Sequence, residues 1–403
     1  MENTFHFYAA NRACSLLYSY IIEHNQGIWL LPVNICPDVP LTFCLAHVQF
    51  EFVDINPITL FIDEEICLDR LSHASEKYAG IVYVRTYGCI KNSTDFFTLC
   101  HRLNPKLRIV DDRCLCIPEE RPNMFGSDIV LYSTGHCKQI DLGYGGLAYT
   151  KENICMPSIL PCYNGTDEQA IYKEAYSKGV PMDIIPLGWL NIEMLSDIRS
   201  YFYQIELEKL DREKQRERLN KLYNDYLPAD IQLDIEYQNW RFNIKVPTSL
   251  RQNILDVLFA NKLFASNHYF SANRLFDYKI YKHSDELSKS IINLFNDKSY
   301  FDKVSLLRFV PHGKGITEMD LTKQELLMIK EWYLSLGNKG KIRLGSPWNI
   351  LGVENSPCII ADEIVIIGFD GIAYPCDSIK YFTKLGISGN IKAVSYTHLR
   401  AHE

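Results

Sequence analysis

The sequence predicts an α/β fold in which helices cover both faces of a parallel or mixed β-sheet. Short apolar runs of strand length alternate with segments of helix length between residues 28 and 134. Two of these runs, GIVYVRTYG (80–88) and DIVLYST (128–134), are almost continuously apolar. Such runs are typical of strands that are buried on both faces, and helices on both sides are the arrangement that buries them.

The first predicted elements are a turn at Asn11-Arg12 and the apolar helix that it opens. We expect helices at 37–47 and 93–103, and strands at 28–33, 48–55, 80–88, 107–112 and 128–134. In sheets of this kind, ligands bind beyond the carboxyl ends of the strands. The prediction therefore brings together the polar groups that follow three strands, which are Tyr87-Gly88, Asp111-Asp112 and the segment from Ser133 to Lys138.

The sequence predicts a large domain at 1–187 and a smaller second domain at 188–303. A long amphipathic helix begins it, because apolar residues recur at helical spacing before the charged run ELEKLDREKQRERLNKLY; they are Met194, Ile198, Tyr201, Phe202 and Ile205. The charged run is interpreted as a solvated face. Next we expect a strand at 242–247, a helix at 250–260 and a further helix ending in INLF (292–295).

The composition is that of an ordinary globular protein, with 47% hydrophobic and 23% charged residues among 403. A net charge of −7 argues against nucleic acid or an anionic membrane as a partner. The sequence contains no apolar run of membrane-spanning length, and its first residues do not resemble a secretion signal. Its 13 cysteines form no CxxC pair, which favours reduced thiols and a cytoplasmic location.

One stretch, DIVLYSTGHCKQIDLGYGGLAYT (128–150), suggests a specific chemistry. It predicts a strand, a small polar turn with Ser133 and Lys138, a glycine-rich turn and a second strand. A lysine held in such a loop suits Schiff-base formation with an aldehyde, above all that of pyridoxal 5′-phosphate (PLP). The alternative is that Lys138 is a surface lysine in an ordinary connection between strands.

Residues 1 to about 300 resemble the DegT/DnrJ/StrS family of sugar aminotransferases, which are PLP-dependent enzymes of the aspartate-aminotransferase fold (fold type I). The resemblance rests on several motifs that occur in the family's order: LPVNICPDVP (31–40), FVDINPITLFID (52–63), VRTYG (84–88), IVDD (109–112), STGHCK (133–138) with GYGG (143–146), GWLNIEM (188–194) and INLFND (292–297). It implies a large cofactor-binding domain and a smaller α/β domain.

The resemblance also implies a role for individual residues. Lys138 would carry the cofactor as a Schiff base and move the substrate proton. Asp112 would pair with the pyridine nitrogen and keep it protonated; a carboxylate that caps a turn is the alternative. The cofactor phosphate would be bound by Asn11, Arg12 and Ser133, at a helix start suited to anions. Asn191 would reach the same phosphate from the partner subunit, so a homodimer with shared active sites is expected.

The activity implied is transfer of an amino group from glutamate to a ketone, on a sugar that is expected to be nucleotide-linked. The chain departs from the family pattern at several positions. Asp111 stands where the family has Glu, and Arg113-Cys114-Leu115 replaces a segment with a polar neighbour of the cofactor. Ile35-Cys36 replaces the usual stacking aromatic. The alternative interpretation is a catalytically degenerate protein of the same fold, or an interaction or electron-relay partner of a radical-SAM enzyme.

Residues 304–391 resemble the end of a radical-SAM protein that enters a SPASM-type extension, with an α+β character. We expect strands at 306–311 and within 359–376, and a helix at 322–336. Cys358 and Cys376 flank a hairpin and would be iron–sulfur ligands, or else ordinary buried thiols. The join near residues 300–304 is either a genuine fusion of two parts or a junction in a sequence chimera, and the sequence favours neither origin. Residues 392–403, which end in SYTHLRAHE, are expected to be a non-native tail.

Overall fold

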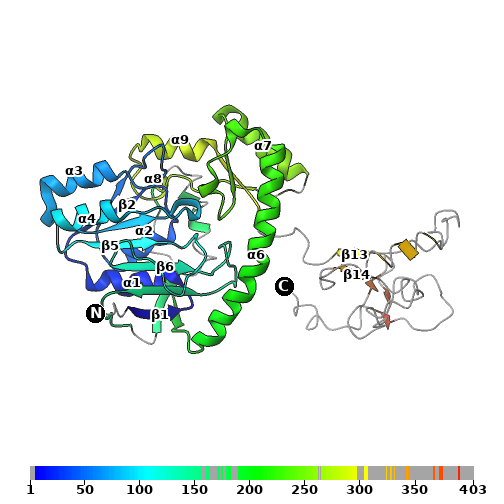
Figure 1. The fold of residues 1–403 in the computed structure, drawn as a ribbon, viewed down its shortest axis with the longest axis horizontal. Helices are drawn as coiled ribbons and strands as arrows, with labels where there is room; N and C mark the ends of the chain where they lie inside the picture. Colours follow the sequence, from blue (N-terminus) through cyan, green and yellow to red (C-terminus); the bar gives the residue numbers. More distant parts are fainter. Residues whose placement is uncertain are drawn as a thin grey trace. The chain divides into compact units, whose positions relative to one another are not determined.

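The computed structural model describes most of the chain up to residue 296 and short pieces beyond it. The described residues are 5–156, 159–163, 170–172, 174–175, 178, 180–182, 189–261, 263, 265–296, 304–306, 324, 327–328, 331, 342–344, 366–367, 372–374 and 389–390. The chain divides into two units, Met1–Lys298 and Ser299–Glu403, which are described separately (Figure 1). The domain boundaries expected at 187 and 303 stay predictions.

A seven-stranded sheet forms the centre of the first unit. Its spatial order is β1-β7-β6-β5-β4-β2-β3. The strands are β1 (His6–Ala10), β2 (Ile28–Pro32), β3 (Phe50–Val53), β4 (Tyr78–Val84), β5 (Arg108–Asp112), β6 (Ile129–Ser133) and β7 (Gly146–Thr150). Strands β2 to β6 are parallel, whereas β7 is antiparallel to β6 and β1 is antiparallel to β7. The prediction of a mixed α/β sheet is confirmed.

Helices pack on the two faces of this sheet because successive strand residues point to opposite sides. Ile81 and Ile109 contact the cluster that includes α3 (Glu64–Ala74) and α4 (Thr94–Leu103). The next residues, Val82 and Val110, belong to the cluster of α1 (Ala13–Glu23) and α2 (Asp38–Leu45). Both faces are therefore buried, which explains why the strand sequences are apolar without alternation.

The smaller part of the first unit begins with the long helix α6 (Ile198–Tyr226), which runs along one side in Figure 1. Tyr201 and Ile205 of its first turns pack on β6 and β7, as the apolar spacing predicts. A three-stranded antiparallel sheet of order β10-β12-β11 follows. Its elements are β10 (Phe242–Lys245), α7 (Thr248–Ala260), β11 (Ala265–Ser266), α8 (Asn273–Phe276), α9 (Lys282–Ser290) and β12 (Ile291–Leu294).

The prediction that a helix ends in INLF (292–295) is wrong in its last part. Helix α9 ends at Ser290, and Ile291–Leu294 is the central strand of the small sheet. This run is fully buried, and it pairs with Phe242–Lys245 on one side and Ala265–Ser266 on the other. Two adjacent β-branched isoleucines favour a strand in such a place, because their side chains pack on both faces of the pleat.

Short elements complete the description of the chain. The remaining elements of the first unit are η1 (Ser75–Lys77), η2 (Thr86–Gly88), η3 (Ala229–Ile231), η4 (Ile235–Tyr237) and the antiparallel pair β8 (Ile159–Tyr163) and β9 (Trp189–Glu193). In the second unit, β13 (Val304–Leu306) is parallel to β14 (Ile342–Leu344). There β16 (Ile372–Tyr374) is antiparallel to both β15 (Ile366–Ile367) and β17 (Gly389–Asn390).

The strands β15 and β16 agree with the two strands expected within 359–376. Cys358, Cys376 and the tail 392–403 lie outside the described residues, so the iron–sulfur hairpin and the SPASM-type resemblance stay predictions. Among the described residues, no cluster of three His, Cys, Asp or Glu side chains could hold a metal ion. None of the helices that the structure describes could cross a membrane.

Candidate active site

Four segments that are distant in sequence meet at the carboxyl edge of the parallel strands. Asp112 is the last residue of β5, Ser133 is the last residue of β6, and Lys138 lies in the loop between β6 and β7. Asn11 and Arg12 join β1 to α1 and contact the end of this loop, because the backbone N–H of Gly145 donates to the carbonyl of Asn11 at 2.8 Å. The structure therefore brings together the predicted residues of the first 150 positions.

The loop that carries Lys138 is held in place by hydrogen bonds on several sides. The Thr134 hydroxyl donates to the carbonyl of Tyr144 at 2.6 Å, and its oxygen lies 2.6 Å from the Tyr201 hydroxyl of α6. The carboxylate of Asp141 accepts from the backbone N–H of Cys137 at 3.0 Å. From the small domain, the indole N–H of Trp240 donates to the carbonyl of Cys137 at 2.7 Å. The backbone next to Lys138 is thus fixed before any ligand binds.

The amine of Lys138 lies in an acidic environment. Its side chain is half-buried, and burial acts to lower the pKa of the ammonium group. The neighbouring acidic groups outweigh this effect and raise the pKa of Lys138 above its ordinary value; they are Cys36, Cys114, Asp112 and Asp38. The raised pKa therefore keeps the Lys138 amine protonated in the free protein.

Asp112 is a buried carboxylate that benefits from a cation beside it. Its Oδ1 accepts a hydrogen bond from the backbone N–H of Cys114 at 2.9 Å. Burial raises the pKa of Asp112, whereas the hydrogen bonds from Cys114 and the charge of Lys138 lower it. A protonated ring nitrogen of a ligand would act in the same direction as Lys138, because an opposite charge stabilises the ionised carboxylate.

The strand edge beside α1 has the features of an anion-binding cradle. The backbone N–H of Gly135 points to the Ser133 hydroxyl oxygen at 3.3 Å. A Cβ atom on Gly135 would lie 3.4 Å from Nη1 of Arg12, so the guanidinium approaches the same loop. A Cβ atom on Gly146 would lie 2.4 Å from the backbone nitrogen of Ala13. Only glycine lets β7 approach the first turn of α1 this closely.

The structure places Asn191 in β9, opposite Pro161 of β8. Three residues later, Met194 forms a β-bridge with Ala10 at the end of β1, next to Asn11. The segment that contains Asn191 is therefore anchored to the strand that leads into the cradle of the same subunit.

Sequence reasoning predicted Tyr87 at this edge of the sheet but missed three aromatic side chains near it, Trp240, His268 and Tyr269. Tyr87 stacks on Trp240 with ring centroids 6.3 Å apart and on Tyr269 with centroids 6.4 Å apart. Tyr269 is coupled electrostatically to Asp112, and His268 to Lys138. His268 is held by Asn293 of β12, whose Oδ1 accepts from its backbone N–H at 2.6 Å. Only the predicted end of the third strand, Tyr87-Gly88, was a signal for this wall.

The imidazole of His268 is neutral under ordinary conditions. Its pKa is lowered to about 4, first by burial and then by the positive charges of Arg241 and Lys138. A neutral imidazole beside a lysine accepts a proton poorly but still offers one donor and one acceptor for hydrogen bonds. The side chain is therefore poorly suited to accept a proton near neutral pH.

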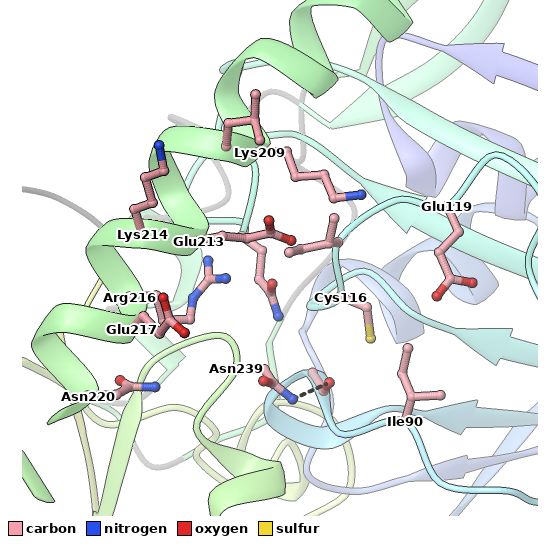
Figure 2. Close-up of a pocket in the computed structure, with 14 residues that line it drawn as sticks. Ile90, Cys116, Glu119, Lys209, Glu213, Lys214, Arg216, Glu217, Asn220 and Asn239 are labelled. Carbon is pink, nitrogen blue, oxygen red and sulfur yellow. Dashed lines mark hydrogen bonds between the residues drawn. The ribbon is translucent and has the colours of Figure 1, made fainter.

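A separate cavity of about 650 Å³ lies behind the lysine loop (Figure 2). Residues of α6 form one wall, and the opposite wall contains Gly88 of η2, Cys116 of the loop after β5, and Gln139. The side chain of Asn239 donates to the carbonyl of Gly88 at 3.3 Å inside this cavity. Lys138 and Asp112 are not among its lining residues, so this cavity and the cradle are two different places.

Comparison with known proteins supports the fold through structure and not through sequence. No protein-family profile matches the chain, and no curated protein sequence matches it. Many solved structures do match. One is a DegT DnrJ EryC1 StrS aminotransferase from Brucella abortus, with 17% identity, a TM-score of 0.52, and coverage of 72% of this chain and 81% of that one.

Two further matches are sugar-related enzymes by their descriptions. The sugar aminotransferase CalS13 from Micromonospora echinospora has 15% identity and a TM-score of 0.54, and the match covers 72% of this chain and 82% of that one. PseC from Helicobacter pylori, an aminotransferase involved in pseudoaminic acid biosynthesis, has 17% identity and a TM-score of 0.51, with 72% and 81% covered. The first unit therefore has the fold of PLP-dependent aminotransferases, as predicted.

We expect Gly146→Ala to destabilise the protein by about 1–3 kcal/mol, because a Cβ atom would overlap the backbone of Ala13. Urea unfolding of both proteins measures the difference. Gly135→Ala is the matched control: it lies in the loop that precedes β7, and the nearest neighbour of its Cβ atom would be 3.4 Å away. Equal losses of stability in the two variants would contradict the close approach of β7 to α1.

We expect the wild-type protein to lose stability between about pH 6.5 and pH 4 in part through His268. The unfolded chain binds a proton on this residue below its ordinary pKa of 6.5, whereas the folded protein binds it only near its lowered pKa of about 4. His268→Gln removes this contribution, so its stability falls less over the same range. Chemical unfolding at a series of pH values measures the slope, and an unchanged slope would show that His268 is not held neutral.

Proposed function

We propose that this chain is a PLP-dependent aminotransferase that moves an amino group from glutamate to a keto group of a sugar, expected to be nucleotide-linked. The observation that carries the proposal is the placement of Lys138 and Asp112 in one buried site, beside a glycine-lined helix start, in the fold of these enzymes. The proposal includes a homodimer in the cytoplasm, in which Asn191 of each subunit serves the site of the other.

The residues of the site fit this cofactor. Lys138 would bind its aldehyde carbon, and Asp112 would face its ring nitrogen. Ser133, Arg12 and the N–H groups near Asn11 would hold its phosphate. When bound, PLP supplies an electron sink for the negative charge that develops on the substrate carbon. The buried Asp112, which is destabilised as an anion by its surroundings, is the group that gains most from a protonated nitrogen.

The chain's own residues would perform the proton movement. Lys138 would be the base that removes a proton from the substrate carbon and returns it elsewhere. The acidic neighbours of its amine would keep it charged at first. The aromatic wall of Tyr87, Trp240 and Tyr269, whose rings are buried against one another, would exclude water from one side of the site.

Support for a sugar acceptor comes from the descriptions of CalS13 and PseC. A sugar presents hydroxyl groups, which polar side chains can bind. Neutral His268 supplies one donor and one acceptor at the edge of the stack. Glutamate as the donor rests on the sequence resemblance alone.

A second candidate function is cofactor binding without turnover. Leu115 is 4% exposed, and it stands where a polar neighbour of the cofactor is expected. Its side chain has no polar group, and its backbone carbonyl accepts a hydrogen bond from the Gln139 side chain at 2.8 Å. A site that lacks this polar side chain could hold the cofactor in a less reactive geometry.

We expect purified protein with added PLP to show a visible absorption band that borohydride fixes covalently on Lys138. Lys138→Ala should lose the band, because no other amine would hold the aldehyde at this site. Lys106→Ala, which removes an exposed lysine, should keep it. Absorption spectra and peptide mass mapping make the measurement. A band that survives Lys138→Ala would contradict the assignment of the site.

We expect glutamate to convert the bound cofactor to its amine form, and Asp112→Asn to slow this half-reaction by roughly a hundredfold or more, since an uncharged partner no longer stabilises the charged ring. Stopped-flow absorbance measures the rate. Cofactor that binds to Lys138 but reacts with no amino donor would favour the second candidate function instead.

A further inference from the structure

Behind the candidate site lies a buried cluster of three charged side chains. Arg85 donates to both carboxylate oxygens of Asp111, with Nε–Oδ1 and Nη2–Oδ2 distances of 2.6 and 2.9 Å. Arg113 donates to Oδ2 of the same carboxylate from Nε at 3.0 Å and from Nη2 at 2.8 Å. All three side chains are at most 1% exposed. Two cations thus share one buried anion. A second carboxylate, that of Glu119, lies 3.6 Å from Nη1 of Arg113, but it is 47% exposed and therefore partly screened by solvent.

Further contacts fix both arginines. Arg85 also donates to the carbonyl of Lys91 at 2.7 Å and to the hydroxyl of Ser93 at 2.9 Å. Its guanidinium lies 4.8 Å from the ring centroid of Tyr83. Arg113 reaches the hydroxyl of Tyr132 at 3.2 Å and the carbonyl of Asn123. With so many partners, each guanidinium has a single defined position, which a solvated arginine does not have.

Residues of the cluster also hold the backbone of β5 on both sides of Asp112. Asp111 and Asp112 are adjacent in β5, so their side chains point to opposite faces of the sheet. The backbone of Arg85 donates to the carbonyl of Asp112 at 2.9 Å, and the backbone of Arg113 donates to the carbonyl of Leu131 at 2.8 Å. Holding Asp111 on one face therefore fixes the direction of Asp112 on the other.

The cluster also changes the electrostatic environment of Asp112. The negative charge of Asp111 alone raises the pKa of its neighbour. Arg85 and Arg113 both bind the carboxylate of Asp111 and so oppose this charge. The other groups that face Asp112 are Lys138 from the lysine loop, Cys114 from its own loop and Tyr269 from the small domain. Of these, only Lys138 is a cation, and its amine is consumed when a cofactor binds there.

We propose that Arg85 and Arg113 are positioning residues, which hold Asp112 in place and ionised for the cofactor ring through their shared partner Asp111. The inference rests on the proposed function. A buried ion cluster of this kind seldom adds stability over an apolar replacement. Its contribution here is to the geometry and charge of the site.

The test measures PLP affinity as a function of pH by equilibrium dialysis, with two single variants that change the cluster charge and the double variant that restores it. Arg113→Met removes a positive charge, so the pH below which affinity falls should rise by about one unit. Asp111→Asn removes the negative charge, so this pH should fall. The double variant restores the net charge, so the pH below which its affinity falls should return to the wild-type value. We call the fall in affinity on the acid side of the profile the acid limb. The cofactor phosphate titrates equally in all four proteins.

Tyr132→Phe is the matched control, because it removes one partner of Arg113 without changing charge, and its acid limb should not move. Circular dichroism of each apoprotein shows whether it folds; if Arg113→Met does not, Asp111→Asn and the double variant carry the same comparison. A wild-type protein that binds no PLP would contradict the proposed function. If the wild-type protein binds PLP but every folded variant loses affinity at the same pH, only the proposed role of the arginines would be overturned.

Discussion

A buried carboxylate at the end of β5 is the constraint on which the candidate site depends. Burial favours the neutral form of Asp112, whereas its proposed role needs the anion. The surrounding structure resolves this conflict with a backbone N–H from Cys114, the amine of Lys138 and the arginine cluster behind the strand. Each of these groups is positioned by a different element, so the charge at one atom depends on the packing of the whole large domain.

The segments that follow α6 also contribute to the site. Trp240 donates to the carbonyl of Cys137, and Tyr201 of α6 contacts Thr134, so the lysine loop is held at two points from outside the large sheet. Tyr87 of η2 stacks on Tyr269, which precedes α8. The position of Lys138 therefore depends on contacts with segments that are distant from it in the sequence.

Most of the large domain could be predicted from the sequence, because its buried strands and helices have distinct lengths and its polar residues follow strand ends. Lys138, Asp112, Ser133 and Arg12 lie at one edge of the sheet, and their roles stay predictions. His268 and Tyr269 could not be found this way, since they reach the site only through long-range packing and follow no recognisable motif. The strand at 291–294 was missed because four apolar residues fit a helix end and a buried strand equally well.

Two departures from the aminotransferase pattern, Asp111 and Arg113, meet in one buried cluster with Arg85. Asp111 is shorter than the glutamate of the pattern, so a partner must approach it closely, and both arginines donate to its carboxylate. Removing one member of the cluster would leave a buried charge with fewer partners, at a cost of several kcal/mol. Arg113 is therefore better understood as part of the support of Asp111, and through it of Asp112, than as a defect in the site.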